Sequence, residues 1–560
     1  MKRALIALLM LSAPAWAATG NDRLIAAARD GLEGEVTTLL AHHVNINATD
    51  DTGATALSWA VMRNNGAVVS RLLKAHANPN LPDANGVTPL MLAIDANQPD
   101  TLRLLLAAGG EARQARPSGE TLLMSAVRAG SADMVRQLLS RNADANARDA
   151  RYQQTALMWA AGHPDIVKLL LDAHADVKAA SKSWETMTTN YSPVVTTVGN
   201  TGIPWLYDNE YRAAAGGVTA LIFAAQKGDL ESVKQLLQAG ADVNQASADG
   251  TTPLLAALYH FVSNRDSEDR NQRGSFGGVS FHPDLGTANF LLDHGAKALA
   301  SDRAGYTPLH VAVMSMLYFN RIGVIVAGID NSGDASRLPD AFKPRQPAST
   351  EQGMALVTRL LAMGADPNAA TRDATPGPLG AVKINPAPPG STPYHLAAAS
   401  GNPDLVNLLA ARGGDANRLR KDGATPFVIA VRSDNLPVVQ ALVAHGADLK
   451  MIYNLSDKVP DPVKSIAEIR KNQTIAHIAA IAGAYRVVPY LAAQGVPLDA
   501  RNDRGETALD LADAQERFRY AIKVQALGNA DKKADDVKRE TQTSDAFKAA
   551  MGQKRTASLP

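Results

Sequence analysis

Cysteine is absent from this chain of 560 residues, and aromatic residues make up only 5% of it. Without a thiol, the chain forms no disulfide bond, no thiolate metal site and no cysteine nucleophile. The 56 Lys and Arg residues nearly balance the 55 Asp and Glu residues, and the formal charge is +1. This balance gives no reason to expect a polyanionic partner, so we predict no binding to nucleic acid.

The common catalytic and cofactor motifs are missing as well. No GxxxxGK[ST], HExxH, GxSxG or CxxC stretch occurs, so phosphate loops, zincin sites and the commonest nucleophile elbows have no support. The run from Asp330 to Asp334 offers oxygen atoms to calcium, but it departs from the DxDxDG spacing of calcium-binding loops. We therefore predict no catalytic residue, no cofactor and no metal site.

The first residues, MKRALIALLMLSAPAWA, have the three parts of a secretory signal. Lys2 and Arg3 precede an apolar stretch at 4–11, and Ala15-Trp16-Ala17 is a small-x-small cleavage site. The apolar stretch is shorter than the roughly 20 residues of a membrane-spanning helix. We expect residues 1–17 to be a signal peptide, no membrane anchor after its cleavage, and a periplasmic or secreted protein, which the lack of cysteine suits.

A threonine followed by an apolar pair and one or two alanines recurs along the chain. Five of the ten intervals between successive threonines are 33 residues, one is 34, and four are longer. Counting back one period from the first threonine leads to a degenerate repeat near Asp22, which makes about twelve repeats in all. The threonines are Thr55, Thr88, Thr121, Thr155, Thr219, Thr252, Thr307, Thr392, Thr425, Thr474 and Thr507.

Each repeat has the pattern of two short helices. In the repeat that begins at Thr219, apolar residues within 221–225 predict one helix, and Val233, Leu236 and Leu237 predict a second at the i, i+3, i+4 spacing. The threonine is suited to cap the first helix. Gly, Asn or His stands 21 residues after most of the threonines, where we predict the left-handed conformation that ends a helix.

The pattern resembles the ankyrin repeat family. Thr307-Pro308-Leu309-His310 matches the TPLH signature of that family, and the segment from Gly240 to Asn244 matches the closing part of its repeat. The resemblance implies an all-α solenoid of about twelve helix-turn-helix units with hairpin fingers and several insertions. It also implies a concave face that binds a partner protein. At the fourth signature position, His310, His395 and His477 are predicted to hydrogen-bond between neighbouring repeats.

On this interpretation residues 18–180 hold repeats one to five, and residues 218–515 hold repeats six to twelve. The longer intervals predict insertions at 181–217 and near 262–284, 318–351, 371–390 and 450–472. A thirteenth repeat at Lys343-Pro344 is an alternative, although no apolar helix follows it. We predict that residues 516–560 form a capping helix and then a mobile charged tail, and that removing the residues after Gly528 changes stability little.

The insertion at 181–217 is rich in aromatic residues for so polar a segment. A solvated linker carries Gly, Ser and charge rather than Trp and Tyr. Two interpretations fit: the rings bind a partner, or they seal the apolar edge where the period breaks. We favour partner binding, and the predicted partner-binding residues are Trp184, Tyr191, Trp205, Tyr207 and Tyr211.

Three functions remain open from the sequence. The absence of catalytic motifs favours an exported, non-catalytic scaffold that docks a partner protein through the concave face and fingers. A ligand-binding or enzymatic site built by the insertions is the second alternative. A structural component of the envelope is the third.

The signal prediction specifies the mature N-terminus. Cleavage after Ala17 gives a chain that begins at Ala18 and lacks two basic residues, so its formal charge is −1. Intact-mass measurement of the protein from its native host checks this, and a mass that includes Met1–Ala17 would contradict export by this signal.

Overall fold

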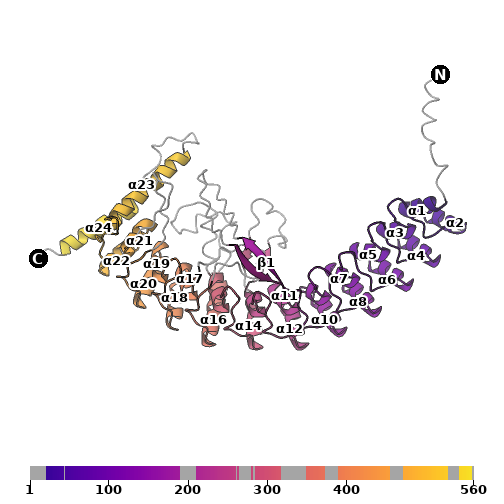
Figure 1. Ribbon diagram of the computed structural model, residues 1–560, viewed down its shortest axis with the longest axis horizontal. Helices are drawn as coiled ribbons and strands as arrows, with labels where there is room; N and C mark the ends of the chain where they lie inside the picture. Colours follow the sequence, from indigo (N-terminus) through magenta and orange to yellow (C-terminus); the bar gives the residue numbers. More distant parts are fainter. Residues whose placement is uncertain are drawn as a thin grey trace, which may run out of the picture. The chain divides into compact units, whose positions relative to one another are not determined.

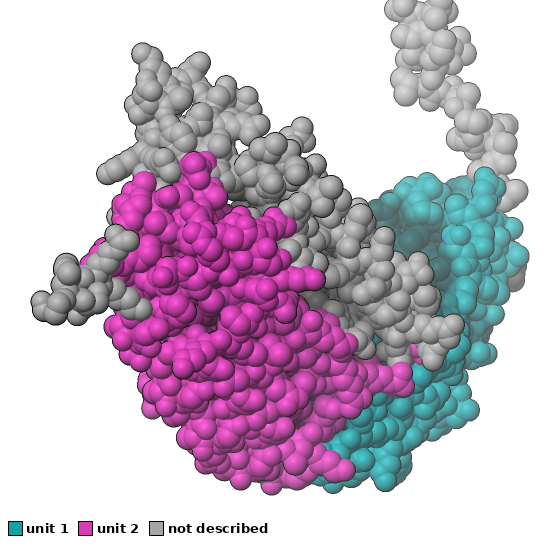
Figure 2. Space-filling view, turned by 60° about the vertical axis from the view of Figure 1, so that its left-hand side comes forward, with its two compact units in different colours: residues 1–183, 216–247 teal, residues 184–215, 248–560 magenta. Residues whose placement is uncertain are grey.

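The computed structural model describes residues 20–42, 44–189, 210–259, 261–263, 279–281, 284–316, 348–372, 389–454, 471–527 and 541–557. The chain forms two compact units, which Figure 2 shows in different colours. Unit 1 comprises residues 1–183 and 216–247, and unit 2 comprises residues 184–215 and 248–560. The signal segment, the run at 330–334 and the alternative repeat at 343–344 lie outside the described residues.

Unit 1 consists of helix pairs stacked in two layers (Figure 1). Each first helix packs against the first helix of the next repeat, and each second helix against the next second helix. The first helices are α1 (Gly20–Asp30), α3 (Ala56–Met62), α5 (Pro89–Asp95), α7 (Leu122–Arg128), α9 (Ala156–Trp159) and α11 (Ala220–Gln226). The second helices are α2 (Glu33–Leu40), α4 (Gly66–Lys74), α6 (Pro99–Ala107), α8 (Ala132–Ser140), α10 (Pro164–Asp172) and α12 (Leu230–Gln238).

The recurring residues act at the helix ends as predicted. The Thr219 hydroxyl accepts the Ile222 N–H at 3.3 Å and so caps α11, and the same contact starts α3, α5 and α7. At the predicted C-terminal position, His76, Asn142 and His174 have φ of 66°, 59° and 60°. These values lie in the left-handed region, which lets the chain leave the helix.

The fifth repeat has lost two residues from the turn between its helices, and the sixth repeat compensates. The shortened turn leaves the Ala161 carbonyl and the Gly162 N–H without partners inside their own repeat. Lys227 Nζ donates to the Ala161 oxygen, and Asp229 Oδ2 accepts from the Gly162 N–H, both at 2.9 Å. Asp229 also caps α12 through the Ser232 N–H.

Unit 2 is also built mainly of stacked helix pairs. Its helices are α13 (Pro253–Leu258), α14 (Leu285–Asp293), α16 (Ala348–Ala362), α17 (Pro393–Ser400), α18 (Pro403–Ala410), α19 (Pro426–Arg432), α20 (Leu436–Ala444), α21 (Ile475–Ala482), α22 (Val488–Ala493), α23 (Ala508–Leu527) and α24 (Gln542–Ala557). Residues 308–316 are helical as well. The prediction of an all-α repeat fold is confirmed.

Two short antiparallel hairpins interrupt the helices within predicted insertions. In the segment 181–217, β1 (Trp184–Thr189) pairs with β2 (Glu210–Ala215), so that Trp184 lies opposite Ala215. In the segment 262–284 and just before it, β3 (Phe261–Ser263) pairs with β4 (Val279–Phe281). Each hairpin returns the chain close to its point of departure, so the helix stacking resumes after the insertion.

Three buried histidines tie neighbouring repeats together, as predicted. His395 Nδ1 accepts the Thr392 N–H, and its Nε2 lies 2.9 Å from the Arg418 carbonyl oxygen in the next finger loop. His310 reaches the Ser391 oxygen at 3.2 Å, and His477 reaches the Glu506 oxygen at 3.0 Å. Burial, and next the positive charge of Arg420, lowers the pKa of His395 to about 4.

The prediction of a mobile tail is wrong for residues 542–557. They form α24, which packs against α22 and α23 and buries Phe547 completely. The Glu516 carboxylate, on α23, is buried and accepts the N–H groups of Thr543 and Ser544 at 2.8 and 3.0 Å. It thereby satisfies the N-terminus of α24, where a negative charge is favourable.

We expect Phe547→Ala to destabilise unit 2 by about 3–5 kcal/mol, the range for removing a buried aromatic ring. Lys548→Ala is the control, because that side chain is exposed and lies 4.0 Å from Asp513, so we expect it to cost less than about 1 kcal/mol. Denaturant unfolding of the full chain measures both. Equal midpoints for the two variants would show that α24 adds no stability.

The buried histidines also predict a pH dependence of stability. Because folding lowers the pKa of His395 from 6.5 to about 4, its contribution to stability is complete above pH 6.5 and is lost as the pH falls toward 4. The stability difference between the wild type and His395→Gln should therefore narrow by about 2 kcal/mol between pH 7.5 and pH 5. Denaturant unfolding at a series of pH values checks this, and a constant difference would contradict it.

Candidate protein-binding face

One position of the first helices in unit 1 lies only half-buried beside the loops that precede these helices. We call these loops the fingers, and the position is the fourth residue after each recurring threonine. Its side chains form what we call the finger face of unit 1: Trp59, Leu92, Ser125, Trp159 and Phe223. All except the buried Ser125 are large apolar side chains that are partly exposed to solvent.

Trp59 is held in place by the finger before it. Its indole N–H donates to Asp50 Oδ2 at 2.7 Å, and the Arg29 guanidinium lies 5.8 Å from the centre of the ring. Burial acts to raise the pKa of Asp50, but hydrogen bonds from Thr52 and Trp59 outweigh it, so the pKa lies below its usual value. The ring is therefore presented in a fixed orientation, which lowers the entropy cost of binding.

Trp159 is held in the same way by the fourth finger. Its indole N–H donates to Gln154 Oε1 at 2.8 Å. In that finger the Arg151 guanidinium lies 4.9 Å from the centre of the Tyr152 ring, and the Lys182 N–H donates to the Tyr152 carbonyl at 2.7 Å. The finger is thus tied to the next one and presents both aromatic and cationic groups.

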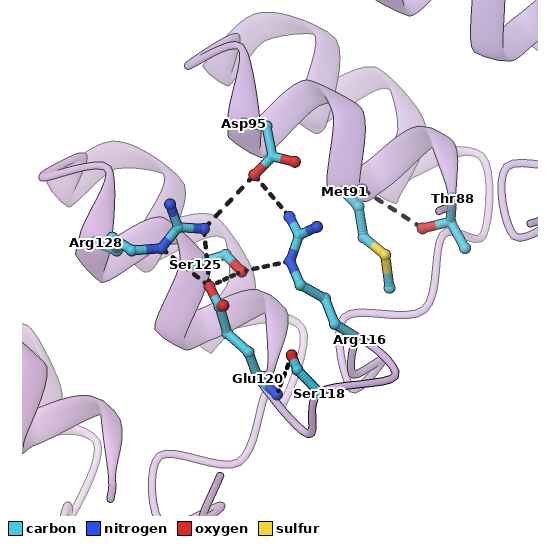
Figure 3. Close-up of polar contacts among 8 residues, drawn as sticks. All are labelled: Thr88, Met91, Asp95, Arg116, Ser118, Glu120, Ser125 and Arg128. Atoms are coloured by element: carbon cyan, nitrogen blue, oxygen red, sulfur yellow. Dashed lines mark hydrogen bonds and ion pairs between the residues drawn. The ribbon is translucent and has the colours of Figure 1, made fainter. Parts of the chain in front are cut away.

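Between the two tryptophans, four charged side chains form a closed network (Figure 3). Asp95, at the end of α5, accepts from Arg116 at 2.6 Å and lies 3.7 Å from Arg128 of α7. Glu120 pairs with Arg128 at 2.9 Å and accepts the Ser125 hydroxyl at 2.7 Å. Two positive and two negative groups compensate one another here, so this part of the face has no net charge.

The structure places only part of the predicted aromatic set. Trp184 lies in β1 and is 39% exposed, and Tyr211 lies in β2 opposite Thr188. Tyr191, Trp205 and Tyr207 lie outside the described residues. Sequence reasoning missed Trp59 and Trp159, although both stand four residues after a recurring threonine, and that shared register was the available signal.

The described residues show little that indicates catalysis or metal binding. No group of three His, Asp or Glu side chains within them could hold a metal ion. In unit 2 the finger residue Asp302 is buried, and its Oδ1 accepts the Tyr306 N–H at 2.8 Å. Burial, together with the nearby Asp249 charge, raises the pKa of Asp302 to about 7. A single buried carboxyl group does not make a catalytic site.

Stacked helix pairs joined by fingers define a helical repeat protein. A family model described as ankyrin repeats (3 copies) matches residues 24–113, 98–181 and 348–453. The model for ankyrin repeats (many copies) matches residues 467–512, and the model for a single ankyrin repeat matches residues 216–248. The chain therefore belongs to the ankyrin repeat proteins. No curated protein matches the chain.

Proposed function

We propose that this protein is a non-catalytic scaffold that binds a partner protein through the finger face of unit 1. Ankyrin repeats generally mediate protein–protein interaction, and proteins of this class are typically non-catalytic. The observation that carries the proposal is the pair Trp59 and Trp159, partly exposed at the same helix position and each held by a finger side chain.

Physical chemistry supports this face over other exposed surfaces of unit 1. Tryptophan, tyrosine and arginine dominate binding energy at protein interfaces, and all three occur on this face and its fingers. The hydrogen bonds from the indoles to Asp50 and Gln154 orient the rings before binding, so little freedom is lost when a partner arrives. The second helices contribute to the opposite layer and carry no such row of aromatic groups.

We also propose that the aromatic insertion at 181–217 adds a second contact for the partner. The exposed Trp184 supports this role, because a tryptophan that only sealed an apolar edge would be buried. Tyr191, Trp205, Tyr207 and Tyr211 belong to the same proposal. A ligand-binding or enzymatic site and a structural envelope role remain weaker alternatives, since no described feature favours either.

The proposed location of the protein is the periplasm or the outside of the cell. This proposal rests on the pattern of residues 1–17 and on the lack of cysteine. Among the described residues, no helix is both long enough and apolar enough to cross a membrane. The partner should then be sought in the envelope fraction of the native host.

The experiment compares partner recovery by tagged variants. Trp59→Gln with Trp159→Gln removes both rings but keeps an amide donor, and we expect it to weaken partner binding by about 30-fold or more. The control, Leu32→Gln, removes an apolar side chain that is 49% exposed between α1 and α2. Trp205→Ala with Tyr207→Ala tests the insertion in the same assay, and thermal melting of each variant reports folding.

Three outcomes would contradict the proposal. The first is that the double tryptophan variant recovers the same stoichiometric partner as the wild type, and in the same amount. Another is equal loss of the partner by Leu32→Gln, which would show that the effect is not specific to the finger face. The third is that the wild type recovers no stoichiometric partner from the envelope fraction.

A further inference from the structure

The balance between positive and negative charges changes along the finger face of unit 1. Around Asp95 every charged side chain has an opposite partner within the network of Figure 3. In parts of the next two fingers, at residues 148–154 and 180–182, the charged residues are Arg148, Asp149, Arg151 and Lys182, whereas the exposed Asp144 and Asp176 lie nearer the preceding helices. The three cations there are exposed, whereas the one carboxylate is buried.

The buried carboxylate does not neutralise its neighbours. Asp149 is 5% exposed, and its oxygens accept the N–H groups of Arg151, Tyr152 and Gln154 at 2.8, 2.7 and 2.7 Å. The Asp149 carboxylate therefore stabilises the turn of the finger through these hydrogen bonds. Within the described residues, Arg151 and Lys182 form no ion pair, and Arg148 donates only to the carbonyls of Gln153 and Ala180.

The finger that carries Arg148 and Arg151 also carries aromatic surface. Arg151 lies over the Tyr152 ring, and Trp159 is fixed to Gln154 of the same finger. We propose that this patch, comprising Arg148, Arg151, Tyr152, Trp159 and Lys182, recognises a short acidic segment of the partner protein with an adjacent apolar side chain. The inference rests on the proposed function and specifies the chemistry of the partner. Carboxylates would meet the three cations, and the apolar side chain would meet Trp159.

A nucleic acid fits this surface less well. A phosphate backbone needs a continuous track of cations, but the neighbouring part of the face is neutral and earlier fingers expose Asp51 and part of Asp83. A strand longer than the patch would therefore run onto carboxylates. A short acidic segment ends before it reaches them.

The test uses the purified full chain and a fluorescein-labelled polyglutamate peptide that carries one leucine, followed by fluorescence anisotropy at about 150 mM salt. We expect the wild type to bind the peptide and Arg151→Gln with Lys182→Gln to bind it roughly tenfold more weakly. Arg141→Gln with Lys168→Gln is the matched control, because it removes the same charge from exposed positions on the second-helix layer. The control should bind as the wild type does.

The outcomes separate this inference from the proposed function. A wild type that does not bind the peptide, equal binding by both double variants, or tighter binding of a single-stranded thymidine oligonucleotide would each overturn the acidic-segment inference. If the native partner is lost by the double tryptophan variant but kept by Arg151→Gln with Lys182→Gln, only this inference fails. Unchanged melting of each variant ensures that lost binding reflects the patch.

Discussion

Each repeat in the two units depends on a neighbour to complete the burial of its apolar side chains. The regular helices of unit 1 after α1 are four to nine residues long, too short to persist alone in water. They are stable because residues such as Leu138 and Val135 are fully buried between layers that several repeats build together. Every other feature, including the finger face, rests on this nearest-neighbour burial.

The polar contacts between repeats set their spacing and register. After the first repeat, a threonine precedes each regular first helix, a residue with positive φ follows each second helix, and a histidine such as His395 bonds to the next finger. Apolar packing is not directional, whereas these bonds have fixed geometry. The regular stacking therefore places equivalent side chains in a row, and this is how Trp59 and Trp159 come to lie on one face.

Features that recur in the repeats could be predicted from the sequence, whereas features that occur only once could not. The period, the threonine caps and the left-handed position follow from local backbone chemistry that recurs at every repeat, so they could be read without a structure. Helix α24 could not, because its charged sequence resembles a solvated tail and its anchor, Glu516, is 27 residues distant from Thr543. The ion network was equally hidden, since Asp95 and Arg116 meet only through stacking.

The turn of the fifth repeat shows how far the repeats are from being interchangeable. Lys227 and Asp229 of the sixth repeat supply the contacts that the shortened turn no longer makes for itself. A sixth repeat with alanine at both of these positions would leave the Ala161 carbonyl and the Gly162 N–H without these partners. The fifth and sixth repeats are therefore structurally coupled, because the deletion in the turn of one repeat restricts which side chains the other can carry at two positions.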